Sequence, residues 1–312
     1  MTGKILEKHG TNFAAIDIGS NAARLLIKRV EEKADGSPEF TKMLMVRVPL
    51  RLGFDVFTIG RLTDEREKNM MRLMKSYSQL MKIYEVEDYR ACATSAMRDA
   101  KNGKKIIKRI KKKTGISIEI IGGQEEAKIV YNNHIECMED RHGNYMYVDV
   151  GGGSTEVNLL SKGVLQYSCS YNIGTVRILN NVVKNGEWER LKDDMKTLAE
   201  KFPGTNIIGS GGNINKLYRL AEKKDRKRLR ITVATLRELH SQLSSLTVKE
   251  RMEEFKLKPD RADVIVPAGD IFLTISDIIG AAYIYVPVIG LSDGIIDSLY
   301  AATKAEEEAG EE

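Results

Sequence analysis

Apolar positions along the chain follow two spacings that alternate from one end to the other. Short apolar runs, typical of strands, are followed by segments whose apolar residues recur every three or four positions, which is typical of helices. The clearest helical segment begins after Thr63, which has the character of an N-cap because acids follow it, and continues to about Ile83. This alternation predicts an α/β fold with mixed sheets flanked by helices.

The same spacings predict the remaining elements. A strand over 42–50 is expected to lead into a loop over 51–62. Further strands are expected over 88–94, 116–121, 164–169 and 283–288. Helices are expected over 101–113, from 124 onward, and over 233–246, 248–256, 271–279 and 295–305.

Two strand–turn–strand units with similar sequences lie about one domain length apart. In each unit an acid ends the first strand and a glycine-containing turn follows. Superposition of the two units places Asp17 on Asp149. It also places Arg24 opposite Glu156. The similarity predicts an internal duplication, with two related domains that face each other and contribute one turn each.

The turn after Asp149 contains three successive glycines, which let the backbone approach a ligand closely and direct several N–H groups at one point. Hydroxyls at Ser154 and Thr155 follow, and then the acid Glu156. Donors for phosphate oxygens beside carboxylates for a metal ion indicate a phosphoanhydride site; a purely structural hairpin is the alternative. The duplication favours the phosphate interpretation, since two turns could grip one polyphosphate from both sides.

Two further segments are interpreted as anion sites, because small polar residues stand where a strand ends and a helix begins. One is at Ser95, followed by Arg98, whose place in the first helical turn is unfavourable against the helix dipole and indicates a ligand contact. The other is the glycine loop over 209–212. The basic runs 101–113 and 223–230 are either solvated helix faces or surfaces that attract a polyanion.

Composition narrows the class of protein. A length of 312 residues, with 42% hydrophobic and 30% charged residues, is typical of a globular protein of about two domains. Cys92, Cys137 and Cys169 have neither paired nor metal-type spacing, which favours a reducing compartment. The N-terminus lacks the apolar segment of a signal peptide, and no apolar run approaches the ~20 residues of a membrane span. We therefore expect a cytoplasmic protein without a membrane partner.

Six short motifs occur in order along the chain: Ile16–Asn21, Ala93–Arg98, Gly123–Ala127, Asp149–Glu156, Gly209–Gly212 and Arg261–Ile265. Together they resemble the exopolyphosphatase/guanosine pentaphosphate phosphohydrolase (Ppx/GppA) family of the actin-like ATPase superfamily. The resemblance implies two actin-like (ribonuclease H-like) domains with the active-site cleft between them. It implies boundaries at 1–136 and 137–312, with the helix over 295–305 as a candidate to complete the first domain.

The resemblance also implies roles for individual residues. Glu126 falls on the family's catalytic glutamate, while Asp149 and Glu156 fall on the acids that handle Mg²⁺ and water. The phosphate-binding residues that it implies are Asp17, Gly19, Ser20, Asn21, Arg24, Arg98, Gly151, Gly152, Gly153, Ser154, Thr155, Gly209, Ser210, Gly211 and Gly212. One position departs from the family pattern: Ala22 stands where a serine is usual, so one hydroxyl ligand is lost.

The activity implied by the resemblance is Mg²⁺-dependent hydrolysis of a terminal phosphoanhydride bond. The chain resembles the short members, with no room after Tyr300 for a helical extension, so we expect an exopolyphosphatase that acts on short-chain inorganic polyphosphate. Guanosine pentaphosphate is the second candidate substrate. An actin-like kinase, or a non-catalytic sensor of guanosine tetra- or pentaphosphate, would also be consistent with these motifs. A homodimer is implied, and no nucleic-acid partner is expected.

Overall fold

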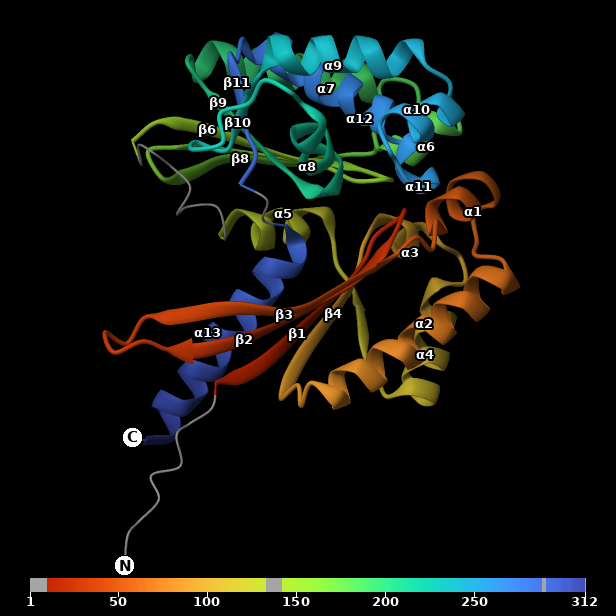
Figure 1. Ribbon diagram of the computed structural model, residues 1–312, viewed down its shortest axis with the longest axis vertical. Coiled ribbons are helices and arrows are strands. Elements are labelled where there is room, and N and C mark those ends of the chain that lie inside the picture. Colours follow the sequence, from red (N-terminus) through yellow and green to blue (C-terminus); the bar gives the residue numbers. More distant parts are fainter. Residues whose placement is uncertain (1–9, 133–141, 288–289, 312) are drawn as a thin grey trace, which may run out of the picture.

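Two mixed β-sheets with helices on their faces form two halves of the molecule, one above the other in Figure 1. This computed structural model describes residues 10–132, 142–287 and 290–311. The first sheet has the strand order β3-β2-β1-β4-β5 and the second the order β10-β11-β9-β6-β7-β8. The expectation of an α/β fold with two mixed sheets is confirmed.

The strands of the first sheet are β1 Thr11–Ile18, β2 Ala23–Glu32, β3 Pro38–Val48, β4 Asp88–Ala93 and β5 Ile118–Ile120. Those of the second are β6 Asn144–Val150, β7 Thr155–Ser161, β8 Val164–Tyr171, β9 Asn206–Ser210, β10 Arg230–Thr232 and β11 Tyr283–Tyr285.

The predicted duplication is present in the topology. Read from β8, the second sheet repeats the order of the first, with β10 as an extra edge strand. Each sheet begins with three consecutive antiparallel strands, β1–β3 in the first sheet and β6–β8 in the second. The first strand of each set then pairs in parallel with the strand that follows the set in the chain, β1 with β4 and β6 with β9. The registers pair Asp17 with Arg24 and Asp149 with Glu156, as the superposition of the sequences suggested.

The helices of the first half are α1 Leu52–Ile59, α2 Asp64–Ile83, α3 Ser95–Asp99, α4 Gly103–Thr114 and α5 Gly123–Asn132. Those that follow are α6 Thr175–Leu179, α7 Glu187–Lys201, α8 Gly211–Leu220, α9 Val233–Ser245, α10 Val248–Glu254, α11 Pro259–Ala262, α12 Ile265–Ile279 and α13 Leu291–Glu311.

Several predicted bounds differ from those of the structure, and two differences have a clear cause. The segment expected as a loop contains α1, a short helix that buries Leu52, Gly53 and Val56. These positions have helical spacing, being four or fewer residues apart. They cover only about one and a half helical turns, however, and one of them is a glycine, so the spacing is too short to predict a helix. Helix α12 begins at Ile265, before the expected start at 271, because Pro267 lies in its first turn, where a missing N–H costs no hydrogen bond.

Side chains alternate across β1 and build two separate cores. Ala14, Ile16 and Ile18 face α2 and α4, whereas Phe13 and Ala15 face the C-terminal helix α13. Helix α13 therefore packs on the first sheet although the second half precedes it in the chain (Figure 1). The expected boundary between residues 136 and 137 lies outside the described residues.

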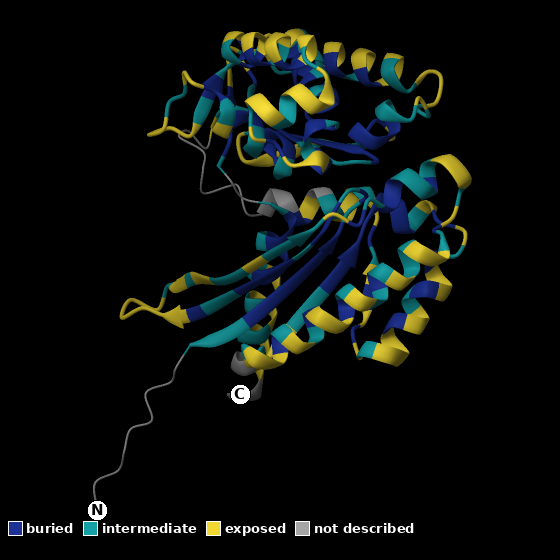
Figure 2. Ribbon diagram, turned by 45° about the vertical axis from the view of Figure 1, so that its right-hand side comes forward, coloured by how far each residue is buried: buried dark blue, intermediate teal, exposed yellow. Residues whose placement is uncertain are grey.

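The second sheet has a large core on one face and a small apolar cluster on the other. Met146, Val148 and Val150 point into the large core, which α7, α8, α9 and α12 complete. Tyr145 and Tyr147 point the opposite way. Helix α5 lies between the two halves, against β7, β8 and α13 (Figure 1). Figure 2 shows the buried strands at the centre of each half and the exposed outer helix faces.

Two sequence expectations concern the environment of the protein. Cys92 and Cys169 are free thiols, whereas Cys137 lies outside the described residues. Within the described ranges, none of the helices has the length and apolar character that a membrane span requires. The cytoplasmic location stays a prediction.

Candidate active site

Three carboxylates from different elements interact at the junction of the two halves. Strand alternation turns Asp149, at the end of β6, and Glu156, at the start of β7, away from the large core. They point to the side where α5 packs, and its first turn carries Glu126. Besides burial, the charges of Glu156 and Asp149 raise the pKa of Glu126, and the charge of Asp149 raises the pKa of Glu156. The sequence predicted these acids, and the structure brings them together.

Burial raises the pKa of both sheet carboxylates. The pKa of Asp149 rises from 3.8 to about 6, although the hydroxyl of Ser210 donates to its Oδ2 at 3.1 Å and opposes the shift. The pKa of Glu156 rises from 4.5 to about 7, because burial and the charge of Asp149 outweigh hydrogen bonds from Ser154 and Ser170. Both groups thus titrate near neutral pH.

Glu126 is the most strongly perturbed of the three. Burial, followed by the charges of Glu156 and Asp149, raises its pKa well above 4.5, and Arg98 offsets this only in part. Its Oε2 atom is buried and has no hydrogen-bond partner. An orphaned carboxylate oxygen carries a desolvation cost of about 1–3 kcal/mol, more if it is charged, and such groups are typical of functional sites.

Arginines line the side of this cluster nearest the first sheet. Arg24 Nη1 lies 2.5 Å from Oδ2 of Asp17, directly across the β1–β2 hairpin. Arg98, on α3, donates to the carbonyl oxygen of Ile121 at 3.1 Å and lowers the pKa of Glu126 and Glu156. Both predicted phosphate ligands therefore lie within electrostatic range of the acids.

Arg261 is a site residue that the sequence interpretation left without a role, although it belongs to one of the six motifs. Burial and the neighbouring Arg47 and Arg24 lower its pKa to about 9. Its Nη1 donates to Oδ1 of Asn213, and its Nη2 occupies the space that a side chain at Gly212 would need. Arg24 reaches the same space, so two guanidinium groups converge at the N-terminus of α8. Such a concentration of positive charge suits an anion.

The two glycine turns touch each other across the junction. A Cβ atom at Gly153 would lie 2.4 Å from both Phe57 Cζ and Ser95 Oγ, and one at Gly152 would lie 2.9 Å from Ser20 Cβ. The hydroxyls of Ser20 and Ser95 are themselves hydrogen bonded at 2.9 Å. At Gly152 and Gly153 the second turn thus packs directly against the first half, and the grip of one polyphosphate by both turns stays a prediction.

Several other predicted phosphate ligands have clear structural roles. Thr155 is fully buried and donates to the carbonyl oxygen of Ile173 at 2.6 Å, so its proton is not available to a phosphate. Gly209 lies inside strand β9, where a Cβ would meet Ile214 at 2.8 Å. Gly211 has a φ of +91° and holds the turn into α8 beside the carboxylate of Asp149.

The remaining turn residues close the hairpins. The Gly19 N–H donates to the Ala22 carbonyl and the Gly151 N–H to the Ser154 carbonyl, at 3.1 and 2.9 Å. Ala22, at the position where the family pattern has a hydroxyl, is buried. Asn21 donates to the carbonyl oxygen of Asp260, and its Oδ1 is buried without a partner.

Ion pairs fasten the two halves on either side of the turns. Arg51 and Asp263 approach to 2.5 Å, and Arg47 and Asp260 to 2.6 Å. Arg177 pairs with Asp99 and also donates to the carbonyl oxygen of Gly153 at 2.7 Å. These contacts hold the halves together beside the acid cluster, and no motif in the sequence indicated the pairs.

The carboxylates fit a hard divalent cation. In the described residues, no three His, Cys, Asp or Glu side chains converge as a ready-made metal site. Mg²⁺, however, commonly takes one or two carboxylates and completes its shell with water and phosphate oxygens. Asp149 and Glu156 supply that number, and the unpartnered Glu126 oxygen marks uncompensated negative charge beside them.

Comparison with known proteins was made by sequence and by fold. Residues 29–302 match the model of the Ppx/GppA phosphatase family. A bifunctional 3-dehydroquinate synthase/phosphatase from Fusobacterium nucleatum is 33% identical over 91% of this chain and 46% of its own length. A guanosine-5'-triphosphate,3'-diphosphate pyrophosphatase from Aeromonas hydrophila is 26% identical over 92% and 59%. The chain thus spans about half the length of these relatives.

An exopolyphosphatase 2 from Mycobacterium tuberculosis is 28% identical over 82% of this chain and 86% of its own. The crystal structure of the Aquifex aeolicus member of the Ppx/GppA family superposes with a TM-score of 0.74, at 27% identity, over 94% of this chain and 98% of that one. The duplicated sheets, the acids at their junction and these matches agree: the chain belongs to the Ppx/GppA phosphatase family.

Proposed function

We propose that the chain hydrolyses terminal phosphoanhydride bonds and that its substrate is inorganic polyphosphate. The observation that carries the proposal is the cluster of Glu126, Asp149 and Glu156, with raised pKa values and with Arg24 and Arg98 beside it. Hydrolysis of this bond requires a placed water, a base and cancellation of phosphate charge, and this cluster offers groups for each. The names of the relatives, an exopolyphosphatase and a guanosine polyphosphate pyrophosphatase, support the same chemistry.

Glu126 is the general base. A carboxylate with a raised pKa accepts a proton from water more readily than an ordinary glutamate does. The free Oε2 atom supplies an acceptor that no protein group uses. When the base takes the proton, the charge it loses relieves its repulsion with Glu156 and Asp149.

Asp149 and Glu156 would hold the cation. Their shared burial and repulsion make a positive partner favourable. A bound Mg²⁺ would neutralise charge on the phosphoryl oxygens. Ser170 and Ser210 orient the two carboxylates, since each donates to one of their oxygens at 2.9 and 3.1 Å.

Arg24, Arg98 and Arg261 bind the phosphates that flank the scissile bond. Each guanidinium offers several donors in a fixed plane, which matches phosphate oxygens. Two of them converge at Gly212, where the helix N-terminus adds partial positive charge. Burial, followed by repulsion from Arg47 and Arg24, lowers the pKa of Arg261 to about 9, and a bound phosphate would offset both effects.

The test is phosphate release in the presence of Mg²⁺ from polyphosphates of several lengths, guanosine pentaphosphate and ATP, compared side by side. Wild-type turnover is expected with polyphosphate, and Glu126→Gln should lower kcat by roughly 10²–10⁴-fold. Glu125→Gln is the matched control, because this neighbour points outward and pairs with Arg90 at 2.7 Å. Equal turnover by the Glu126 and Glu125 variants would contradict the assignment of the base.

The same assay separates the competing functions. Faster phosphate release from guanosine pentaphosphate than from polyphosphate would identify guanosine pentaphosphate as the substrate. Tight nucleotide binding by calorimetry without phosphate release would indicate a sensor. The homodimer belongs to the proposal as well, and sedimentation of the purified chain tests it.

A further inference from the structure

A basic groove on the first half opens beside the acid cluster. It has a volume of about 600 Å³ and is formed where α3 ends, α4 begins and β5 passes into α5. Its lining includes the charged side chains of Arg98, Lys101, Lys104 and Lys105, and also Ile120, Ile121 and Gly122. We call these residues the lysine groove. Its lining contains four cations, no carboxylate and no aromatic ring.

Two residues of the groove also interact with the acids of the proposed active site. Arg98 lines the groove and also acts electrostatically on Glu126 and Glu156. Gly122 lines the groove as well, and its carbonyl accepts the N–H of Glu126 at 3.0 Å, in the first turn of α5. A chain of phosphates bound at the acids can therefore pass Arg98 into the groove.

Two lysines of the groove destabilise the helix that carries them. Lys104 and Lys105 lie in the first turn of α4, where positive charge opposes the helix dipole, and that turn contains no acid. The preceding Asn102 does not cap the helix, because its side chain bonds the backbone of Leu62 instead. In the part of the chain that the structure describes, Lys101, Lys104 and Lys105 have no ion pair. Helix stability does not explain three exposed cations here, whereas an anionic ligand does.

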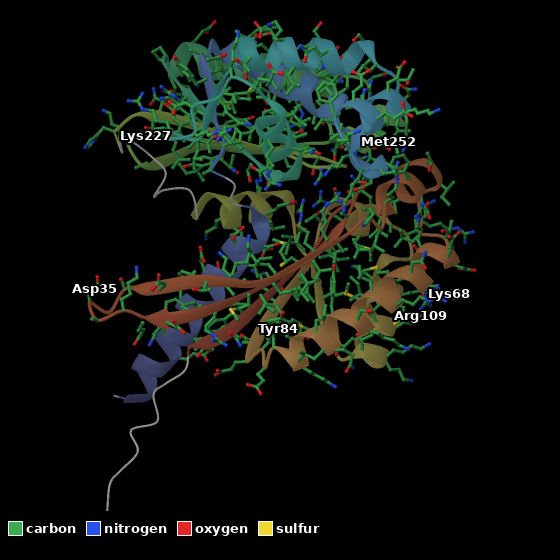
Figure 3. All side chains as sticks on the ribbon, in the orientation of Figure 1. Asp35, Lys68, Tyr84, Arg109, Lys227 and Met252 are labelled. Carbon is green, nitrogen blue, oxygen red and sulfur yellow. The ribbon has the colours of Figure 1, made fainter. Side chains whose placement is uncertain are left out.

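The rest of the basic run behaves differently. Arg109 lies on the outer side of the first half, as Figure 3 shows, and makes two short hydrogen bonds to Glu67. Lys111 and Lys112 are exposed in the last turn of α4, where cations favour the helix dipole. Only the lysines in the first part of the run therefore lack a structural role, and a bound anion would explain them.

We propose that the lysine groove binds the part of an inorganic polyphosphate chain that extends beyond the phosphates held at the acid cluster. The inference rests on the proposed function and specifies its substrate. Lysine ammonium groups and a helix N-terminus bind consecutive phosphates by charge without requiring a particular shape. A guanine base would find no aromatic ring to stack on and no carboxylate to accept its N–H groups. The groove thus favours long polyphosphate over guanosine pentaphosphate, and it replaces the short-chain substrate expected from the sequence with a longer one.

The experiment compares two double variants with equal charge change on the same helix. Lys104→Gln/Lys105→Gln removes the groove cations, and Lys111→Gln/Lys112→Gln is the matched control. Binding of tripolyphosphate and of long-chain polyphosphate is measured by calorimetry without Mg²⁺, so that the measurement does not depend on turnover. Phosphate release with Mg²⁺ is measured separately.

The groove variant is expected to weaken long-chain binding by roughly 5- to 30-fold and to lower the ratio of long-chain to tripolyphosphate affinity. The slope of log Kd against log salt should fall by about 1 to 2, as two lysine–phosphate contacts are lost. The thermal stability of this variant should not fall, because cations are removed from a helix N-terminus.

Three results would overturn the proposal: an unchanged long-chain Kd, an equal loss in the control variant, or an equal loss for tripolyphosphate. The second would indicate diffuse attraction by the whole helix. If wild-type protein binds long polyphosphate in the groove but releases no phosphate, the proposed hydrolysis has failed while the groove is upheld. The two proposals are therefore tested apart.

Discussion

Asp149→Asn should stabilise the protein in a pH-dependent way. The folded chain raises the pKa of this carboxyl from 3.8 to about 6, mainly by burial. Below pH 3.8 the carboxyl is protonated in both folded and unfolded chains, so burial costs nothing through ionisation. Between pH ~4 and ~6 the unfolded chain loses the proton that the folded chain retains, and the free energy of unfolding of the wild type falls as pH rises.

The size of this effect follows from the shift. A difference of about 2 pKa units corresponds to at most about 3 kcal/mol, fully lost by the wild type above pH ~6. The asparagine variant has no charge to bury, and its amide oxygen can still accept from Ser210. Relative to wild type, the variant should therefore gain up to about 3 kcal/mol between pH 4 and pH 8.

The assay is urea unfolding at both pH values in a metal chelator, followed by circular dichroism. Glu200→Gln, an exposed position on α7, is the control for a charge removed from the surface. The reasoning is refuted if Asp149→Asn gains no more stability between the two pH values than the Glu200 variant. Phosphate release by Asp149→Asn should be strongly reduced. The negative charge of this carboxylate lowers the stability of the folded chain but is needed to bind the cation.

Three further predictions concern the junction. Added Mg²⁺ should raise the thermal midpoint of the wild type at pH 8 and raise that of Asp149→Asn less, which differential scanning fluorimetry can measure. Gly153→Ala should destabilise by about 1–3 kcal/mol, because its methyl group would lie 2.4 Å from Phe57 and Ser95; Gly290→Ala, at a position with open space, is the control. Thr155→Val should lower the free energy of unfolding by about 1–3 kcal/mol in denaturant, because the carbonyl of Ile173 loses its hydrogen-bond donor, while kcat changes little. A large loss of kcat would instead show that this hydroxyl contributes to the active site.

Local pattern was sufficient for most of the elements and for Asp149 and Glu156, whereas Glu126 was indicated only by the family resemblance. The hairpin of Asp149 and Glu156 could be read from apolar alternation around three glycines, and the matching hairpin at Asp17 revealed the repeat. These features depend on neighbours in the sequence, where period and turn chemistry act directly. The short helix α1 was missed for the same reason, since eight residues around Gly53 carry too little pattern.

Contacts between segments that are distant in the chain could not be predicted from the sequence. Arg261 was visible as part of a motif, but its approach to Arg24 at Gly212 depends on how the two halves pack. The sequence suggested that glycines of the triple turn bind phosphate, which stays a prediction; the tertiary structure adds that Gly152 and Gly153 also let the opposing half approach closely.

The sequence by itself determined the repeated α/β pattern, the acids Asp149 and Glu156 and the basic run, because each depends on residue type and local spacing, and the family resemblance added Glu126. Only the tertiary structure decided which of these groups meet. It buried Glu126 against Asp149 and Glu156, and it separated Lys104 and Lys105, which line the groove, from Lys111 and Lys112, which do not. The physical reason is that burial, desolvation and charge–charge distance belong to the packing of the two halves and have no local signature in the chain.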